Sequence, residues 1–95
     1  MAALLIRHRV VDYHAWRRDF DGQAHARTAN GCQHVQVFRN AADPHEMVLI
    51  LTWDTVVRAQ LFLQSEEWIE SIDRGGLTDR PELWLLEEIG DGPTA

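Results

Sequence analysis

The sequence predicts an α+β domain with the element order strand, helix, strand, strand, helix, strand. Apolar residues that alternate with a period of two, or that form a short continuous run, indicate strands at residues 3–11, 32–40, 47–53 and 82–89. Apolar residues spaced by three and four indicate helices between the first and second strands and between the third and fourth. The 95 residues suffice for one hydrophobic core, so we expect a single domain over residues 1–89 and a frayed tail over residues 90–95.

The first strand and the helix after it carry the clearest periodicity. His8 shares a strand face with Ile6 and Val10, because alternate residues of a strand point the same way. Asp12 is a suitable N-cap for the helix that follows, and Asn30-Gly31 is a suitable end for it. The predicted apolar face of this helix consists of Tyr13, Trp16, Phe20 and Ala24.

The second and third strands are predicted to form a hairpin. The turn between them covers residues 41–46 and includes Asp43 and Pro44, both typical turn residues. In the second strand, Val35 and Val37 share one face. The other face is expected to carry Cys32, His34, Gln36 and Phe38. The third strand is apolar at nearly every position, as expected of a central strand that is covered on both faces.

The segment between the third and fourth strands is expected to contain two helices. Asp54 or Thr55 can cap the first of them. Ser65, which is followed by two acidic residues, resembles a second N-cap and predicts a break in the helix there. A short helix that carries Trp68 then runs to residues 75–76.

This order of elements is that of the split βαβ, or ferredoxin-like, fold, in which helices cover one face of a four-stranded antiparallel sheet. The other face is left uncovered, yet the first, third and fourth strands carry apolar residues on both faces. Because such a face is unfavourable in water, we expect it to pair with a second copy of the chain as a homodimer.

Composition excludes several classes of function. The formal net charge is −6 and the acids are scattered, so a nucleic-acid partner is not expected. The chain has no lysine, which excludes a Schiff base on a lysine amine, and a single cysteine, which excludes a disulfide within the chain and a cysteine-rich zinc site. No apolar run reaches the length of a membrane-spanning helix, and the charge order at the start is not that of a signal peptide. We therefore expect a cytoplasmic protein without a cofactor, a metal ion or a membrane partner.

Several short stretches resemble the dimeric α/β-barrel superfamily. They are Arg7-His8-Arg9-Val10, Asp12-Tyr13 with Trp16, Phe20-Asp21, Gly31, Phe38-Arg39-Asn40, Asp43-Pro44, Trp53-Asp54 and Pro81-Glu82. Over residues 3–89 the chain is most similar to small proteins related to antibiotic-biosynthesis monooxygenases, some of which are labelled cyclases. The resemblance implies two sheets packed face to face in a homodimer and a pocket between the sheet and the helices of each subunit. Ile72 stands where the haem-degrading branch has its histidine ligand, so haem is not expected.

The candidate site residues are two histidines and a set of polar and aromatic neighbours. His8 is the candidate catalytic base, because imidazole titrates near neutral pH and can take a proton from an acidic phenol or enol. His34 is the second candidate catalytic residue, and it or Gln36 would orient a substrate oxygen. The candidates for packing against substrate rings are Phe38, Trp53 and Trp68.

Each candidate also has a structural interpretation. His8 could be a buried histidine held by protein hydrogen bonds, and His34 and Gln36 could lie on a solvated edge strand. The tryptophans could be core or dimer contacts.

The sequence therefore leaves two functions open. One is cofactor-independent oxygenation or cyclisation of an aromatic or polyketide-like substrate, which requires an apolar cavity that reaches the His8 ring. The other is a non-catalytic homodimer that binds a ligand or serves as an accessory subunit.

Overall fold

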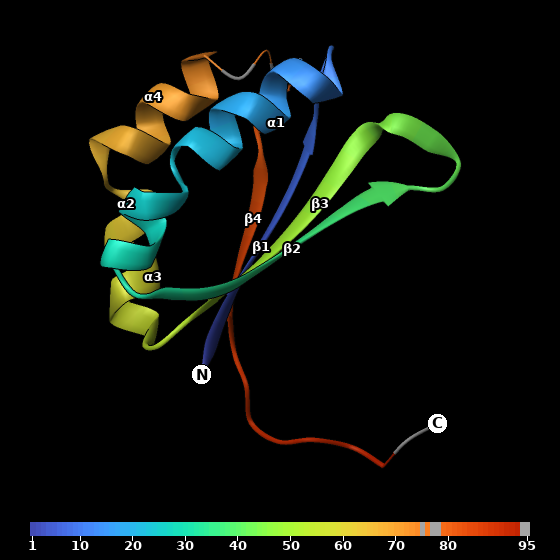
Figure 1. The fold of residues 1–95 in the computed structure, drawn as a ribbon. Helices are drawn as coiled ribbons and strands as arrows, with labels where there is room; N and C mark the ends of the chain where they lie inside the picture. The colour runs from blue at the N-terminus through green and yellow to red at the C-terminus, as the bar shows by residue number, and fades with distance from the viewer. Residues whose placement is uncertain (75, 77–78, 94–95) are drawn as a thin grey trace.

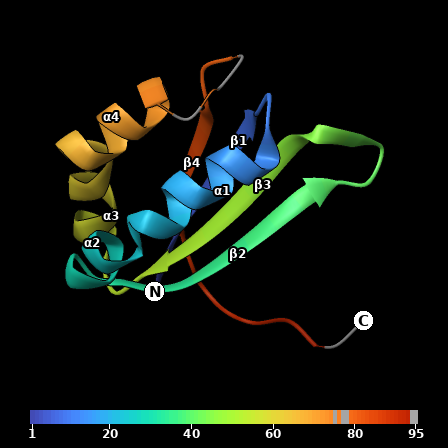
Figure 2. The ribbon, with the colours of Figure 1, turned by 45° about the horizontal axis from the view of Figure 1, so that its top comes forward.

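The structure, a computed structural model, describes residues 1–74, 76 and 79–93. Within them the chain forms one antiparallel sheet with the strand order β2-β3-β1-β4 and helices that pack on it (Figure 1). The elements are β1 (Ala2–Arg9), α1 (Tyr13–Gly22), α2 (Ala24–Ala29), β2 (Cys32–Asn40), β3 (Asp43–Trp53), α3 (Val56–Leu63), α4 (Glu66–Arg74) and β4 (Glu82–Glu87). All the helices lie on one side of the sheet (Figure 2), which confirms the predicted ferredoxin-like α+β fold.

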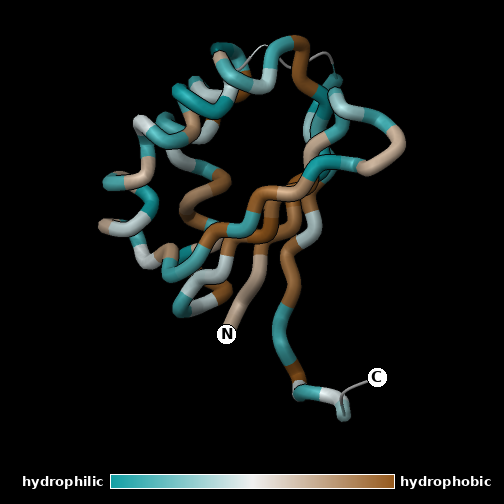
Figure 3. The backbone as a smooth tube through the Cα atoms, turned by 45° about the vertical axis from the view of Figure 1, so that its right-hand side comes forward, coloured by the Kyte–Doolittle hydropathy of each residue, from teal (hydrophilic) through white to brown (hydrophobic). Residues whose placement is uncertain are grey.

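The hydrophobic core lies between the sheet and the helices. Figure 3 shows the apolar segments along the strands, whereas the helices around them are mostly hydrophilic. Alternation along β1 and β3 directs one set of side chains to the helices, and their burial defines the core. The strand residues of the core are Ala2, Leu4, Ile6, Cys32, Met47, Leu49, Leu51 and Trp53. Val10, just after β1, and the helix residues Trp16 and Ala59 complete it.

The opposite face of the sheet has no helix over it. Leu5 of β1 lies between Ile50 of β3 and Trp84 of β4 on this face. Trp84 and Leu86 of β4 are both 44% exposed. The expectation of an apolar open sheet face is therefore met by the central strands and by β4.

The helix caps agree with the sequence patterns. Asp12 accepts hydrogen bonds from the backbone N–H groups of His14 and Ala15, at 3.0 and 3.3 Å. Thr55, one of the two candidates, caps α3, and the Ser65 hydroxyl accepts a bond from the Trp68 N–H at 3.2 Å. The predicted break between α3 and α4 is confirmed. The end expected for the second of these helices at residues 75–76 falls partly on residue 75, which lies outside the described residues.

Four local expectations were wrong. The helix predicted to run unbroken to Asn30-Gly31 is divided at Gln23, because the Phe20 carbonyl accepts from the Gln23 N–H and from the Arg27 side chain instead of continuing the helical ladder. The hairpin turn is shorter than residues 41–46, since β3 already begins at Asp43. The first strand ends at Arg9 and the last at Glu87, each two residues earlier than expected.

Cys32 also lies on a different face than expected. The pairing of β2 with β3 shifts by one residue between Cys32 and His34, as at a β-bulge. Cys32 therefore faces the helices and is buried, whereas His34 faces the open side. No helix in the described part of the chain is long and apolar enough to cross a membrane.

Candidate functional site

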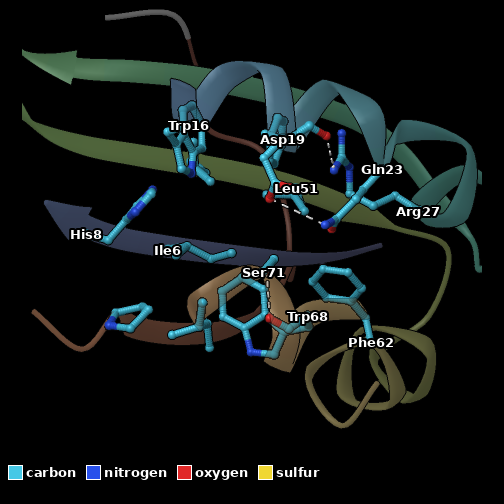
Figure 4. Close-up of a pocket in the computed structure, with 14 residues that line it drawn as sticks. Ile6, His8, Trp16, Asp19, Gln23, Arg27, Leu51, Phe62, Trp68 and Ser71 are labelled. Carbon is cyan, nitrogen blue, oxygen red and sulfur yellow. Dashed lines mark hydrogen bonds between the residues drawn. The ribbon is translucent and has the colours of Figure 1, made fainter. Parts of the chain in front are cut away.

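A narrow cavity lies between the helix-covered face of the sheet and the helices (Figure 4). Its walls come from β1, β3 and all the helices, and they are mainly apolar and aromatic. Its polar lining residues are His8, Asp19, Gln23, Arg27 and Ser71. The free volume is about 30 Å³. A water molecule needs about 10–15 Å³ by this measure, so the cavity as it stands holds roughly two waters.

His8 enters this cavity from the middle of the sheet. Its side chain points to the helices, is only 4% exposed, and lies 5.2 Å from the Trp16 ring, centroid to centroid. Neither ring nitrogen has a hydrogen-bond partner among the described residues. Burial lowers the pKa of His8 from 6.5 to about 4, because the apolar surroundings disfavour the imidazolium. At neutral pH the ring is therefore neutral, and both its N–H and its lone pair are free to bind a ligand.

Aromatic rings form two walls of the cavity. On one side the Trp16 and Phe20 rings of α1 stack with centroids 5.0 Å apart. On the other side Phe62 of α3 and Trp68 of α4 lie 5.6 Å apart. The Ser65 hydroxyl caps α4 at the Trp68 N–H, and the Trp68 side chain packs against the hydrophobic core. Walls of this kind suit a flat aromatic ligand.

Arg27 is a cavity residue that the sequence analysis missed. Its side chain is only 6% exposed, and its Cζ lies 3.7 Å from the centre of the Phe20 ring. Nη1 donates a 2.7 Å hydrogen bond to the Phe20 carbonyl, while Nε has no partner. Burial lowers the pKa of Arg27, although a guanidinium stays charged at neutral pH. A sequence signal existed, since Arg27 follows Ala24 by three residues and so continues the apolar face of the predicted helix.

Asp19 and Arg74 connect two helices beside the cavity. Arg74 Nε of α4 lies 2.9 Å from Asp19 Oδ1 of α1. Gln23 makes a longer contact of 3.5 Å to the other carboxylate oxygen of Asp19. Because Asp19 and Gln23 both line the cavity, this connection forms part of its wall.

Comparison with known proteins identifies the family. Residues 10–74 match the family model described as antibiotic biosynthesis monooxygenase. The chain belongs to this family. No curated protein matches the chain in sequence.

Solved structures share the fold of this family member at low sequence identity. SnoaB, a cofactor-independent oxygenase from Streptomyces nogalater, is similar with a TM-score of 0.78 and 14% identity, over 98% of this chain and 97% of that chain. Rv0793 from Mycobacterium tuberculosis is similar with a TM-score of 0.74 and 18% identity, over 97% of this chain and 98% of that chain.

The structure brings together only some of the predicted site residues of this family member. His8 and Trp68 both line the cavity. His34, Gln36 and Phe38 lie on the opposite face of the sheet, on the edge strand β2, and are exposed. The pattern of alternation could not choose the face, since β1 is apolar on both.

Trp53 belongs to the core and not to the cavity wall. It is fully buried, and its ring packs 4.9 Å from Phe62. Within residues 1–74, 76 and 79–93, no three His, Cys, Asp or Glu side chains are grouped so that they could hold a metal ion.

Proposed function

We propose that this member of the antibiotic biosynthesis monooxygenase family is a cofactor-independent oxygenase that acts on an aromatic or polyketide-like substrate, with His8 as the base. The observation that carries the proposal is His8 itself, a neutral imidazole that is buried at a cavity wall without a hydrogen-bond partner in the described residues. Leaving a buried polar group unpaired costs about 1–3 kcal/mol, so a ligand that pairs with it gains affinity. The fold shared with SnoaB, a cofactor-independent oxygenase, supports the same function.

The proposed reaction requires from the protein only a base and an apolar cavity. His8 would remove a proton from a phenolic or enolisable substrate whose rings lie between Trp16 and Trp68. The resulting carbanion or phenolate is electron-rich enough to reduce dioxygen. One oxygen atom becomes bonded to the substrate carbon. The other leaves as water with two hydrogens of the substrate, both from the oxidised carbon of an anthrone, or one from that carbon and one from the hydroxyl group of a phenol. The negative charge of the substrate anion would raise the pKa of His8 and so stabilise the imidazolium formed in the first step.

Substrate binding requires the cavity to widen. Drug-sized ligands occupy pockets of about 300–1,000 Å³, well above the 30 Å³ of free space. α4 is the element best suited to move, because none of its residues is buried although Trp68, Ser71 and Ile72 line the cavity. We infer that α4 shifts away from α1 when a substrate binds.

The open sheet face is proposed to form a homodimer interface. Leu5, Val48, Trp84 and Leu86 border an open apolar groove on this face, together with the Arg7 side chain. A second copy that places the same face against them would cover all four apolar side chains at once. His34, Gln36 and Phe38 would then lie at or near the dimer interface.

The alternative function is that of a non-catalytic homodimer that binds a ligand, and the small free volume of the cavity favours this alternative.

Measurement of oxygen uptake separates the two functions. We expect the protein to accelerate oxygen consumption with anthrone or a naphthohydroquinone above the spontaneous rate, and His8→Ala to lower this acceleration by about 10²–10⁴-fold. His14→Ala, a change on the exposed surface of α1, is the matched control. Binding of these compounds without any oxygen uptake would favour the non-catalytic function.

A further inference from the structure

Arg27 combines burial of its charge with the lack of a carboxylate partner in the described residues. Five exposed arginines have a carboxylate within 4.0 Å, and examples are Arg7 with Glu46 and Arg17 with Asp21. Arg27 is buried, and no carboxylate of the described residues lies within that distance. Burying a charged group without an opposite charge is strongly unfavourable, so such a site is typical of ligand binding.

The protein holds the guanidinium in place but leaves one of its edges free. The Phe20 ring covers one face at 3.7 Å, and Nη1 is bound to the Phe20 carbonyl near the end of α1. Nε has no partner, and no hydrogen bond to Nη2 occurs in the described part of the chain. Nε and Nη2 together present two parallel N–H donors, the arrangement that binds a carboxylate through both of its oxygens.

The position of Arg27 relative to His8 sets the shape of the ligand. Both residues line the same cavity, and Figure 4 shows His8 toward one end of it and Arg27 toward the other. Between them lie apolar side chains of β1 and β3 and the aromatic walls. A ligand that reaches both residues is therefore flat and apolar in the middle and carries an anionic group at the end away from His8.

We propose that Arg27 binds a carboxylate of the ligand, so that the substrate class is a flat aromatic carboxylic acid. The inference rests on the proposed function in that both use this cavity as the ligand site. It adds a residue and a chemical group that the oxygenation step does not require. Arg27 is thus a specificity-determining residue, and His8 acts on the opposite end of the molecule.

A binding experiment without oxygen tests this inference. Anthracene-2-carboxylate and its neutral isostere anthracene-2-carboxamide are titrated anaerobically by calorimetry. We expect the wild-type protein to prefer the carboxylate by about 10- to 100-fold, the range expected for charge-assisted hydrogen bonds. Arg27→Met should remove this preference while the amide affinity stays within about threefold, because the aliphatic part of the side chain remains.

Two further variants make the result specific. Arg27→Lys should keep part of the preference, since it retains the charge but not the paired donors. Arg18→Met, on the exposed surface of α1, should leave the preference unchanged. Arg27 also binds the end of α1, so unfolding is followed by circular dichroism, and Arg27→Gln replaces the Met variant if the latter does not fold.

The outcomes separate this inference from the proposed function. Equal or weaker affinity of the wild-type protein for the carboxylate, including no binding, contradicts the role of Arg27. A preference that survives in Arg27→Met also contradicts it. Because no turnover is measured, a lost preference in Arg27→Met supports the carboxylate site even if oxygen uptake is never observed.

Discussion

Arg74 Nε lies 2.9 Å from Asp19 Oδ1, and this ion pair joins α4 to α1 beside the cavity. The two residues are 55 positions apart in the chain and belong to the two helices that face each other over the sheet. Both side chains are partly exposed, so water and salt weaken their attraction. The pair is therefore a weak connection between the elements that must separate to admit a substrate.

Breaking this pair should speed ligand binding. In Arg74→Ala we expect the association rate of anthracene-2-carboxylate to rise roughly two- to fivefold at low salt, the scale of an exposed ion pair. High salt should reduce the difference from the wild-type protein. Stopped-flow quenching of tryptophan fluorescence measures both rates. Arg17→Ala breaks a pair within α1 and is the control, and equal rates for Arg74→Ala and the wild type at low salt would exclude α4 opening as the limiting step.

His8 should make stability depend on pH in a defined interval. Unfolded His8 takes up a proton below about pH 6.5, whereas folded His8 does so only near its pKa of about 4. Between these values the unfolded state binds more protons, so the free energy of unfolding falls as the pH is lowered from 6.5 to 4, by on the order of 3 kcal/mol. Below pH 4 this residue causes no further loss.

Urea unfolding of the wild type and of His8→Leu at pH 7, 5 and 4 tests this dependence. The variant removes a buried polar group without a partner, so we expect its stability at pH 7 to equal or exceed that of the wild type. Its advantage should grow as the pH falls to 4. A constant difference across the three pH values would mean that folding does not lower the pKa of His8.

The open sheet face should control association. Trp84→Glu places a charge among the apolar side chains of this face, and we expect it to convert a dimer into a monomer at micromolar concentration. Sedimentation velocity distinguishes the two states. Val57→Glu is the control, because Val57 is an exposed apolar residue on α3, away from the open sheet face. A wild-type protein that sediments as a monomer would contradict the proposed interface.

Gly31 should be the least tolerant of substitution among the glycines that the structure describes. Its φ is +103°, and an added Cβ would lie 2.7 Å from Arg58 Cδ and from Asp54 Oδ1. We expect Gly31→Ala to lower the free energy of unfolding by about 1–3 kcal/mol, because left-handed backbone and crowding both oppose a side chain. Gly22→Ala, in a helix and with open space around it, should have no effect or a small stabilising one. If Gly31→Ala and Gly22→Ala changed the stability in thermal unfolding equally, the proposed crowding and backbone strain at Gly31 would be contradicted.

The sequence predicted the framework of this protein because the relevant interactions are local. The caps at Asp12, Thr55 and Ser65 bind backbone groups two or three residues away, and all three were predictable. The order of the elements followed from periodicity in the same way. The β2–β3 hairpin was also predictable, although not the exact start of β3.

The tertiary structure decided the composition of the cavity. Alternation placed His8 on one face of β1 but could not say which face the helices cover, since both are apolar. Arg27 became a cavity residue because α1 ends early and the chain turns its guanidinium onto Phe20. The bulge at Cys32 likewise directed His34 away from His8. These outcomes depend on how segments far apart in the chain pack against one another. The periodicity within one segment carries no information about that packing.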